Sequence, residues 1–206
     1  MAYNYETIAE KLYYKNEPIV EYKAVYPVIT GTENGISKIN EELKADAELY
    51  VKKIKDSFYP KAAVAFDSTN NGEDNFSGFY ISYNAVVMSE ENGKLSVLVK
   101  YDEDTGDEGS RLYYKAFNRN MSNGNRFFVN DYFKSKEDVI SSVTEQIERE
   151  IKDGNESYLP DWRERVSRLF KPQSFYLKEN KLIVFYDQYD LMSYSFGVKE
   201  FEIANI

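Results

Sequence analysis

The fold is decided by residues 79–101, FYISYNAVVMSEENGKLSVLVKY, which form two largely apolar runs on either side of Asn92-Gly93. In the second run Leu95, Val97 and Val99 stand at every second position, which is the period of a β-strand. Asn-Gly favours a tight turn between paired strands, because both residues tolerate the left-handed backbone that the turn requires. We therefore predict that Phe79–Met88 and Lys94–Tyr101 pair as an antiparallel hairpin.

The N-terminal third predicts a second strand pair followed by a helix. Tyr3–Tyr14 and Pro18–Ile29 are rich in Tyr, Ile and Val, and they flank Lys15-Asn16-Glu17, which predicts an antiparallel pair. The pattern changes to a helical period from about Gly35 to Ser57, and we predict that Pro60 stops this helix. The apolar stripe of the helix consists of Ile36, Ile39, Leu43, Ala47, Tyr50, Val51, Ile54 and Phe58.

Beyond the central hairpin the chain predicts further strands and two helices. Ser135 and Asp138 have the spacing of a capping box and open a helix that we expect to end at Gly154. The other expected elements are a strand at 112–117, a short helix within 159–170, two strands about Glu179-Asn180 and a last strand at 201–204. Polar loops are expected at Asp67–Asn75 and Asp102–Gly109.

The order of these elements predicts the fold class. Strands dominate, and two helices interrupt them without a βαβ alternation. Such an order is typical of the α+β class, with a mostly antiparallel sheet and two main helices packed on it.

The composition excludes most familiar catalytic sites. The sequence has no Cys and no His, so disulfides, thiolate nucleophiles, His-bearing zinc sites and Ser-His-Asp triads are absent. Pairs among the 35 acidic residues remain, and no motif selects one of them. The sequence therefore predicts a protein with no catalytic residues, no metal site and no cofactor.

The charge narrows the choice of partners. Asp plus Glu number 35 against 26 Lys plus Arg, which gives a net charge of −9 at pH 7. Such a protein repels phosphate backbones and anionic lipid surfaces, so nucleic acid is not expected as a partner, whereas a basic protein or a neutral surface is suitable. No run of 18 apolar residues occurs, and we expect no membrane span in this chain.

The last third carries the most specific motif of the chain. The motif consists of Phe175-Tyr176-Leu177, Leu182-Ile183-Val184-Phe185-Tyr186, Gln188-Tyr189-Asp190, Gly197 and Glu200-Phe201. This order resembles the RsiV-like family, a bacterial domain of unknown function, and Asn130–Phe133 before the Ser135 helix is similar to the family's L-x-D-L-F stretch.

The N-terminal half carries a second resemblance. Tyr26-Pro27-Val28-Ile29 and Ile39-Asn40 are similar to the accessory domain that precedes the RsiV-like domain and the catalytic module of the PdaC peptidoglycan deacetylase. The two resemblances divide the chain into an accessory region at 1–103 and an RsiV-like region at 104–206, which we expect to pack as one compact unit.

The resemblance implies a non-enzymatic, extracytoplasmic sensor or binding domain of Gram-positive bacteria. In anti-sigma factors of the RsiV type such an ectodomain binds lysozyme, so the expected partner is a basic protein such as lysozyme. The alternative is an accessory module of a peptidoglycan-modifying enzyme that binds cell-wall glycan. Either function favours an extracellular or cell-surface location over the cytoplasm.

The resemblance also places the recognition edge near Asp190–Gly197, which we expect to form an exposed corner between two strands. Where the family commonly has an Ala-Pro step, this chain reads Leu191-Met192-Ser193-Tyr194-Ser195-Phe196, and Glu108-Gly109-Ser110-Arg111 stands in place of a Gly-Gly-Ala-His-like stretch. We expect the partner to contact Ser193, Tyr194, Ser195 and Phe196, with the two aromatic side chains as anchors.

A second set of candidate partner-binding residues is acidic. Ten acidic residues and only two lysines lie between Asp67 and Ser110, a local charge of −8. We expect all ten to lie in connections between strands, where Asp102, Asp104, Asp107 and Glu108 would attract a cationic partner. Solubility is the alternative interpretation. The acidic loops match a calcium loop only in part, and the sequence leaves open the ligand, the oligomeric state and any calcium binding.

The missing His and Cys lead to a first prediction. The purified protein is expected to leave muropeptides unchanged, with neither hydrolysis nor deacetylation detectable by mass spectrometry. A measurable reaction that is lost on changing a single acidic residue would overturn this prediction.

Overall fold

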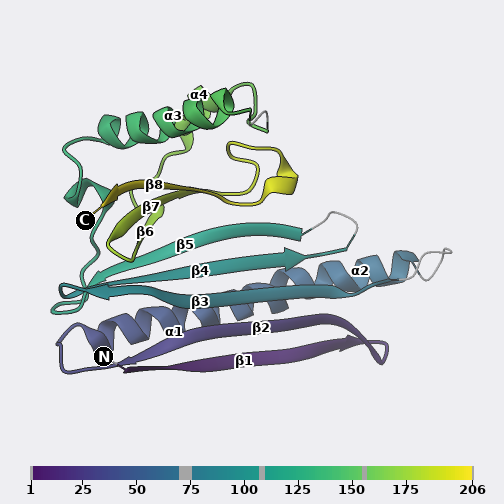
Figure 1. Ribbon diagram of the computed structural model, residues 1–206. Coiled ribbons are helices and arrows are strands. Elements are labelled where there is room, and N and C mark those ends of the chain that lie inside the picture. Colours follow the sequence, from purple (N-terminus) through teal and green to yellow (C-terminus); the bar gives the residue numbers. More distant parts are fainter. Residues whose placement is uncertain (1, 70–75, 107–109, 155–156, 206) are drawn as a thin grey trace. The chain divides into compact units, whose positions relative to one another are not determined.

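The computed structural model describes residues 2–69, 76–106, 110–154 and 157–205. Five strands form one sheet in the order β1-β2-β3-β4-β5, and three form a second in the order β6-β7-β8 (Figure 1). The strands are β1 (Ala2–Tyr14), β2 (Glu17–Thr30), β3 (Phe79–Glu91), β4 (Lys94–Asp104), β5 (Ser110–Asn120), β6 (Phe175–Lys178), β7 (Lys181–Tyr186) and β8 (Lys199–Asn205). The fold belongs to the α+β class, as the sequence predicts.

The helices are α1 (Ile36–Lys53), α2 (Tyr59–Thr69), α3 (Lys136–Lys152) and α4 (Trp162–Leu169), with a π-helical turn η1 (Ile54–Phe58) and two 3-10 turns, η2 (Val129–Asp131) and η3 (Tyr194–Phe196). Within the described ranges, no helix is long and apolar enough to cross a membrane.

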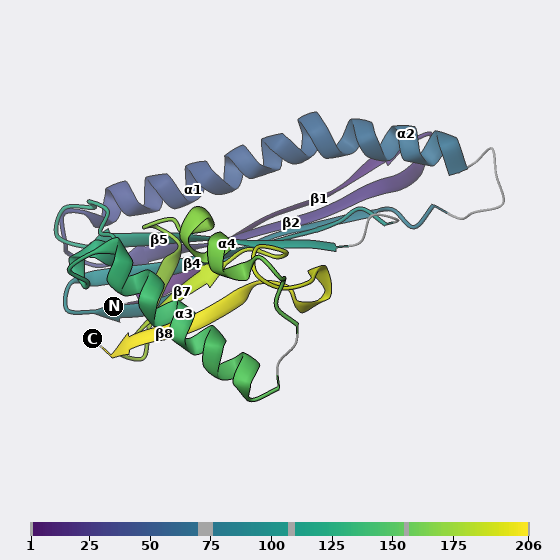
Figure 2. The same ribbon diagram turned by 90° about the horizontal axis from the view of Figure 1, so that it is seen from above.

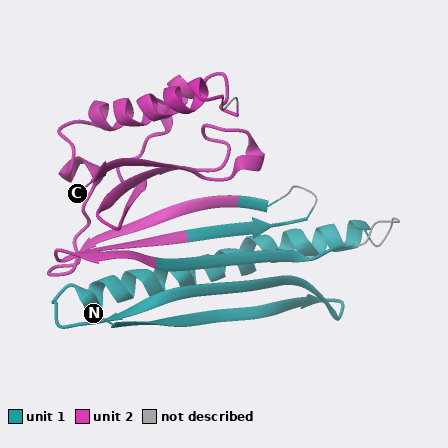
Figure 3. Cartoon of the chain, in the orientation of Figure 1, with its two compact units in different colours: residues 1–86, 100–111 teal, residues 87–99, 112–206 magenta. Residues whose placement is uncertain are grey.

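The chain forms two compact units that share three strands (Figure 3). Unit 1 contains residues 1–86 and 100–111, and unit 2 contains residues 87–99 and 112–206. The division differs from the expected regions 1–103 and 104–206, because β3, β4 and β5 each contribute one end to each unit.

Three two-residue turns fix the strand pairs. Lys15-Asn16, Asn92-Gly93 and Glu179-Asn180 all have positive φ between 50° and 73°, the left-handed backbone of the primed hairpin turns. The predicted hairpins about these turns are confirmed, and the strands extend beyond the predicted ends: β3 continues to Glu91 and β4 to Asp104.

The central connection corrects the expectation that no βαβ unit is present. β2 and β3 pair in parallel from Val20↔Phe79 to Val25↔Asn84, and α1, η1 and α2 lie between them in the sequence. Parallel neighbours need such a crossover because a tight turn cannot reverse the chain twice. The continuous rod of α1, η1 and α2 runs along β1 and β2 (Figure 2).

Pro60 does not stop this helix, contrary to the prediction. The chain passes through η1, where the Tyr59 amide donates to the carbonyl of Ile54, five residues back, and α2 then begins at Tyr59. Proline lacks an N–H and crowds the carbonyl of the preceding turn, and its ring is tolerated in the first turn of a helix. A π turn directly before Pro60 relaxes that crowding and lets the rod continue.

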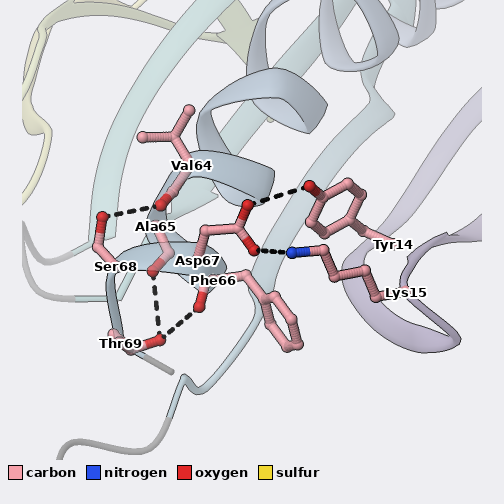
Figure 4. Close-up of polar contacts among 8 residues, drawn as sticks. All are labelled: Tyr14, Lys15, Val64, Ala65, Phe66, Asp67, Ser68 and Thr69. Carbon is pink, nitrogen blue, oxygen red and sulfur yellow. Dashed lines mark hydrogen bonds and ion pairs between the residues drawn. The ribbon is translucent and has the colours of Figure 1, made fainter. Parts of the chain in front are cut away.

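Asp67 lies in α2 and not in a loop, which corrects the polar loop predicted at 67–75. Its carboxylate accepts hydrogen bonds from Tyr14 Oη at 3.0 Å and Lys15 Nζ at 2.7 Å (Figure 4). It thereby ties the end of α2 to the β1–β2 turn, and the Lys15 ammonium holds the pKa of the Asp67 carboxyl below its usual value. Residues 70–75 of that predicted loop lie outside the described residues.

The core of unit 1 includes a cluster of tyrosines whose hydroxyls donate hydrogen bonds to two carboxylates. Tyr83 and Tyr101 both donate to Asp46 Oδ2, at 3.1 and 3.0 Å, and Tyr50 donates to Glu103 Oε1 at 3.0 Å. The ring centroids of Tyr50 and Tyr101 lie 4.8 Å apart in an edge-to-face arrangement. Aromatic rings can be buried here because each polar tip has a partner.

Glu103 therefore belongs to the core and not to an acidic loop. It is 5% exposed, and it accepts from Lys53 Nζ at 2.7 Å as well as from Tyr50. Asp102 and Asp104 also lie in β4, so the prediction that all ten acidic residues fall between strands is wrong. Glu103 can be buried within the strand because its carboxylate accepts from the half-exposed Lys53 ammonium and the buried Tyr50 hydroxyl.

In unit 2 the β6–β8 sheet lies between two apolar layers. On one face, Phe175, Leu182 and Phe201 pack in a cluster with residues of α3 and α4. On the other face, Tyr176 and Phe185 pack with Leu98 of β4. Most residues of β6 and β7 are buried, which matches their nearly continuous apolar sequence, whereas β8 alternates buried Phe201 with exposed Glu200 and Glu202.

A buried hydrogen-bond network joins β4, β5 and β6 inside unit 2. Ser96 Oγ donates to Asn118 Oδ1 at 2.5 Å and accepts from the Leu177 amide at 3.1 Å, and Asn118 Nδ2 donates to the Phe175 carbonyl at 2.7 Å. Ser96 is fully buried and Asn118 is 3% exposed. Each polar group of this pair is therefore satisfied away from water.

This network gives a prediction about stability. Ser96→Ala leaves the Leu177 amide and Asn118 Oδ1 buried without their partner, and we expect a loss of about 1–3 kcal/mol in the free energy of unfolding. The measurement is urea unfolding followed by circular dichroism. Ser141→Ala is the matched control, because the Ser141 hydroxyl bonds an exposed glutamate on the surface of α3. Equal losses in the two variants would contradict the importance of the Ser96 network.

Candidate binding corner

The connection between β7 and β8 is a compact corner rather than an extended loop. It spans residues 187–198 and contains the turn η3. Three aromatic side chains of this segment are exposed: Tyr189 by 53%, Tyr194 by 42% and Phe196 by 53%. We call these three residues and the backbone of 187–197 the aromatic corner.

The start of the corner is fixed to the edge strand β5. The Leu112 amide donates to Gln188 Oε1 at 2.7 Å, and the Tyr114 amide donates to Asp187 Oδ1 at 3.0 Å. The two amides are two residues apart, so they point to the same side of β5. Asp187 and Gln188 thus act as a side-chain cap on the sheet edge, which would otherwise present unpaired donors.

The cap also reaches the exposed part of the corner. Gln188 Nε2 donates to the Tyr194 carbonyl at 2.9 Å, so one amide side chain links β5 to η3. Within η3, the Phe196 amide donates to the Ser193 carbonyl at 3.1 Å. The backbone that carries Tyr194 and Phe196 is therefore held from two directions.

Arg165 of α4 holds the corner from the other side. Its Nη1 donates to the carbonyls of Tyr189 and Asp190, at 3.2 and 3.3 Å, and its guanidinium lies 5.6 Å from the centre of the Tyr189 ring. Asp161, one helical turn earlier, accepts from Arg165 Nε at 2.8 Å and fixes the guanidinium plane. An arginine suits this role because its planar fork donates in several directions at once.

Two buried residues anchor the middle of the corner. Leu191 and Met192 are 1% and 5% exposed, and both belong to the apolar cluster of unit 2. The Leu159 amide donates to the Leu191 carbonyl at 2.9 Å. The aromatic side chains on either side of this pair remain exposed while the backbone between them is buried.

The corner contains two left-handed backbone positions. Tyr189 has φ 69°, which is uncommon for a bulky residue, and Gly197 has φ 69° with ψ −149°. The second combination is open essentially to glycine alone. Strain of this kind persists only where surrounding contacts hold it, and Arg165 and Gln188 supply those contacts on either side.

The Asp190 carboxyl is partly removed from water. It accepts from the Asp187 amide at 2.9 Å, which closes a small turn at the start of the corner. Burial raises the pKa of Asp190, and the neighbouring Asp187 carboxylate acts in the same direction. The raised pKa means that the fold disfavours the ionised form of this group.

The candidate residues of the sequence analysis fall into two separate groups. Ser193, Tyr194, Ser195 and Phe196 are all exposed and lie in unit 2, as the exposed-corner prediction requires. Asp102 and Asp104 lie in unit 1, where Asp102 accepts from Ser110 Oγ and Asp104 from the Gly106 amide at 3.0 Å. Asp107 and Glu108 lie outside the described residues.

The residues that hold the corner are not apparent from the sequence. Tyr189 was part of the motif but was not expected as a contact residue, and Asp187, Gln188 and Arg165 were not expected to act together. The i, i+4 spacing of Asp161 and Arg165 was the one available signal. The side-chain cap on β5 depends on pairing between segments about 75 residues apart, which no local pattern reports.

The corner combines exposed aromatic rings with the hydroxyls of Ser193 and Ser195. Its serines have no base motif beside them in the sequence, which has no His. Among the described residues, no group of three or more carboxylates is placed to hold a metal ion. What the corner offers is aromatic area on a fixed backbone.

Comparison with known proteins gives a family match for the part of the chain that holds the corner. Residues 125–204 match the family described as Protein of unknown function (DUF3298). Comparison with the curated proteins finds no match.

Two solved structures have a similar fold over almost the whole chain. A member of the DUF3298 family from Bacteroides fragilis has a TM-score of 0.70 at 17% identity, covering 98% of this chain and 89% of that one. A DUF3298 family protein from Pseudomonas aeruginosa has a TM-score of 0.55 at 12% identity, covering 98% and 91%. At these identities the likeness concerns the fold alone.

The raised pKa of Asp190 predicts the pH dependence of stability. A carboxyl whose folded pKa is raised stabilises the fold most below its unfolded pKa, near 3.9, and the contribution is lost as the pH rises through the folded pKa. Asp190→Asn keeps an acceptor for the Asp187 amide and removes the buried charge. We expect this variant to be more stable than the parent at pH 7, with the difference vanishing as the pH falls below about 4.

Asp161→Asn is the control, for which we expect the opposite change in stability at pH 7. The Arg165 side chain lowers the pKa of Asp161, so the contribution of this carboxyl is present at neutral pH and is lost on acidification. Asp161→Asn should therefore be less stable than the parent at pH 7, and the gap should close toward low pH. Chemical unfolding across the pH range tests both variants, and the same sign for both at pH 7 would contradict the assignment.

Proposed function

We propose that this protein is a non-enzymatic, extracytoplasmic binding domain that recognises a basic protein such as lysozyme through the aromatic corner. The observation that carries the proposal is the exposure of Tyr189, Tyr194 and Phe196 on a backbone fixed by Gln188 and Arg165. The resemblance of the last third to the RsiV-like ectodomains of anti-sigma factors supports the choice of partner and the location outside the cytoplasm.

Exposed aromatic side chains are the residues that protein interfaces use as anchors. Tyr and Trp are enriched among the few side chains that dominate binding, because they bury much area and still offer a polar tip. Tyr194 combines a ring that is 42% exposed with neighbours Ser193 and Ser195, whose hydroxyls can bond a partner at the rim. The corner thus has an aromatic centre and a polar edge, which is the usual arrangement of an interface.

A fixed backbone makes such anchors more effective. Ordering a loose loop on binding costs free energy that is subtracted from the affinity. Here the hydrogen bonds from Gln188 and Arg165, with buried Leu191 and Met192, hold the segment before any partner arrives. The Tyr194 and Phe196 side chains alone would need to be ordered in the complex.

The charge of the chain supports a cationic partner. A net charge of −9 attracts a basic protein over a distance of about one Debye length, roughly 8 Å at physiological ionic strength. We propose that Asp102, Asp104, Asp107 and Glu108 contribute to this attraction, which acts mainly on the association rate. Glu103 contributes less, because Lys53 already neutralises it.

Truncation of the anchors tests the proposal. Tyr194→Ala combined with Phe196→Ala is expected to weaken lysozyme binding by about 30-fold, the effect of losing about 2 kcal/mol at an interface centre. Isothermal titration calorimetry at low salt measures the dissociation constant. Both side chains are largely outside the core, so the variant should keep the unfolding midpoint of the parent.

Phe128→Ala is the matched control for this experiment. Phe128 is 41% exposed, is also in unit 2, and lies outside the corner. Its truncation should leave lysozyme affinity unchanged. The proposed role of the corner fails if the control weakens binding as much as the double variant does, or if the parent does not bind lysozyme at all.

A further inference from the structure

A hollow of about 470 Å³ opens on the sheet of unit 1, apart from the aromatic corner. It lies on β2, β3 and β4 and includes one residue of β5, and its volume is within the range of about 300–1,000 Å³ typical of small-molecule sites. Its lining includes Glu21, Lys23, Tyr80, Ser82, Asp102 and Asp104.

Strand alternation places these side chains on the face of the sheet that α1 does not cover. Tyr22 points to the helical side, where the Lys55 ammonium lies 5.9 Å from its ring centre. Glu21 and Lys23 flank Tyr22 and therefore point to the other side, and their partners in register on β3 are Tyr80 and Ser82. On β4, Glu103 is bonded to Tyr50 of α1, so Asp102 and Asp104 also point away from the helix.

Tyr80 provides an aromatic surface beside polar groups of both signs. Its ring is 54% exposed, although its neighbours along β3, Phe79 and Ile81, are buried. Lys23 is a donor of hydrogen bonds, Asp102 and Asp104 are acceptors, and the hydroxyls of Tyr80 and Ser82 serve in both ways. A ligand that both donates and accepts through many hydroxyls, and that has an apolar face for the ring, is complementary to this set.

Other ligand classes fit the hollow less well. The described residues hold no metal-binding group of three carboxylates. A basic side chain could pair with Asp102 or Asp104, but Lys23 would oppose it, and Lys11 already binds Glu21 at 2.9 Å. A phosphate or nucleic acid would be repelled by the carboxylates. A neutral saccharide meets none of these objections.

We propose that this hollow is a saccharide-binding site, in which one face of a sugar ring stacks on Tyr80 and its hydroxyls bond to Asp102, Asp104 and Lys23. Hydrogen bonds to charged groups are the stronger kind, so two carboxylates and an ammonium can replace the water that a sugar loses on binding. The site is independent of the aromatic corner and of any protein partner.

The experiment is a ¹H–¹⁵N NMR titration of the full chain with two neutral tetrasaccharides, one of N-acetylglucosamine and one of glucose. At least one of them is expected to shift the amides of Tyr80, Ser82 and Asp102. Tyr80→Ala should weaken the binding by about tenfold, and Tyr80→Phe, which keeps the ring, should retain most of it. Because Tyr80 is exposed, both variants are expected to fold as the parent does.

Tyr5→Ala is the control, because Tyr5 is an exposed tyrosine of the same unit outside the hollow. Its removal should leave the titration unchanged. The inference is overturned if neither saccharide shifts these amides, if the shifts persist in Tyr80→Ala, or if lysine amide, added as a cationic probe, shifts them when the saccharides do not. No protein partner is present, so the result does not depend on whether lysozyme binds the corner.

Discussion

The rest of the structure depends on one constraint, which is that the middle of β4 must be covered on both of its faces. Leu95, Ser96, Val97, Leu98 and Val99 are each at most 1% exposed. Leu98 reaches Tyr176 and Phe185 of the second sheet, and Ser96 bonds the Leu177 amide of β6. Farther along β4, the Tyr101 ring packs against Tyr50 of α1, and Glu103 accepts a hydrogen bond from the Tyr50 hydroxyl. The strand therefore contributes residues to both compact units, 94–99 to unit 2 and 100–104 to unit 1.

The aromatic residues of the chain fall into two classes, those buried in the core and those exposed on the surface. Tyr50, Tyr83 and Tyr101 are buried because Asp46 and Glu103 accept their hydroxyls, so these tyrosines need no functional explanation. The aromatic rings of the corner and Tyr80 have no comparable burial. Other exposed rings, such as Phe128 and Tyr5, share this exposure, but only the corner combines several exposed rings on a fixed backbone, and Tyr80 lies in a hollow beside charged groups. The two proposed sites follow from this distinction.

Local sequence signals predicted the strand pairs well and the connections poorly. The turns at Asn92-Gly93 and Lys15-Asn16 could be located from the sequence, because the left-handed backbone of these turns depends on the two residues themselves. Pro60 was misread because a π turn, and not the end of the helix, absorbs it. Asp67 and Glu103 were predicted in loops because charged side chains usually face solvent. Each instead pairs with a lysine about 50 residues away in the sequence, Lys15 for Asp67 in its helix and Lys53 for Glu103 in its strand.

The same limit applies to the candidate site. The exposure of residues 193–196 could be predicted, since these polar and aromatic residues lie between two strands, whereas Leu191 and Met192 in the same predicted corner are buried. Its rigidity could not, because it depends on Leu112, Tyr114 and Arg165 meeting the corner from distant parts of the chain. Long-range hydrogen bonds of this kind leave no periodic trace in a single sequence.

The most direct test of the proposed binding function is hydroxyl-radical footprinting of the parent protein with and without lysozyme, read residue by residue by mass spectrometry. The proposed function predicts that oxidation of Tyr194 and Phe196 falls in the complex, while oxidation of Phe128, a ring 41% exposed outside the corner, does not change. Unchanged oxidation of both corner residues under conditions where lysozyme is bound would contradict it.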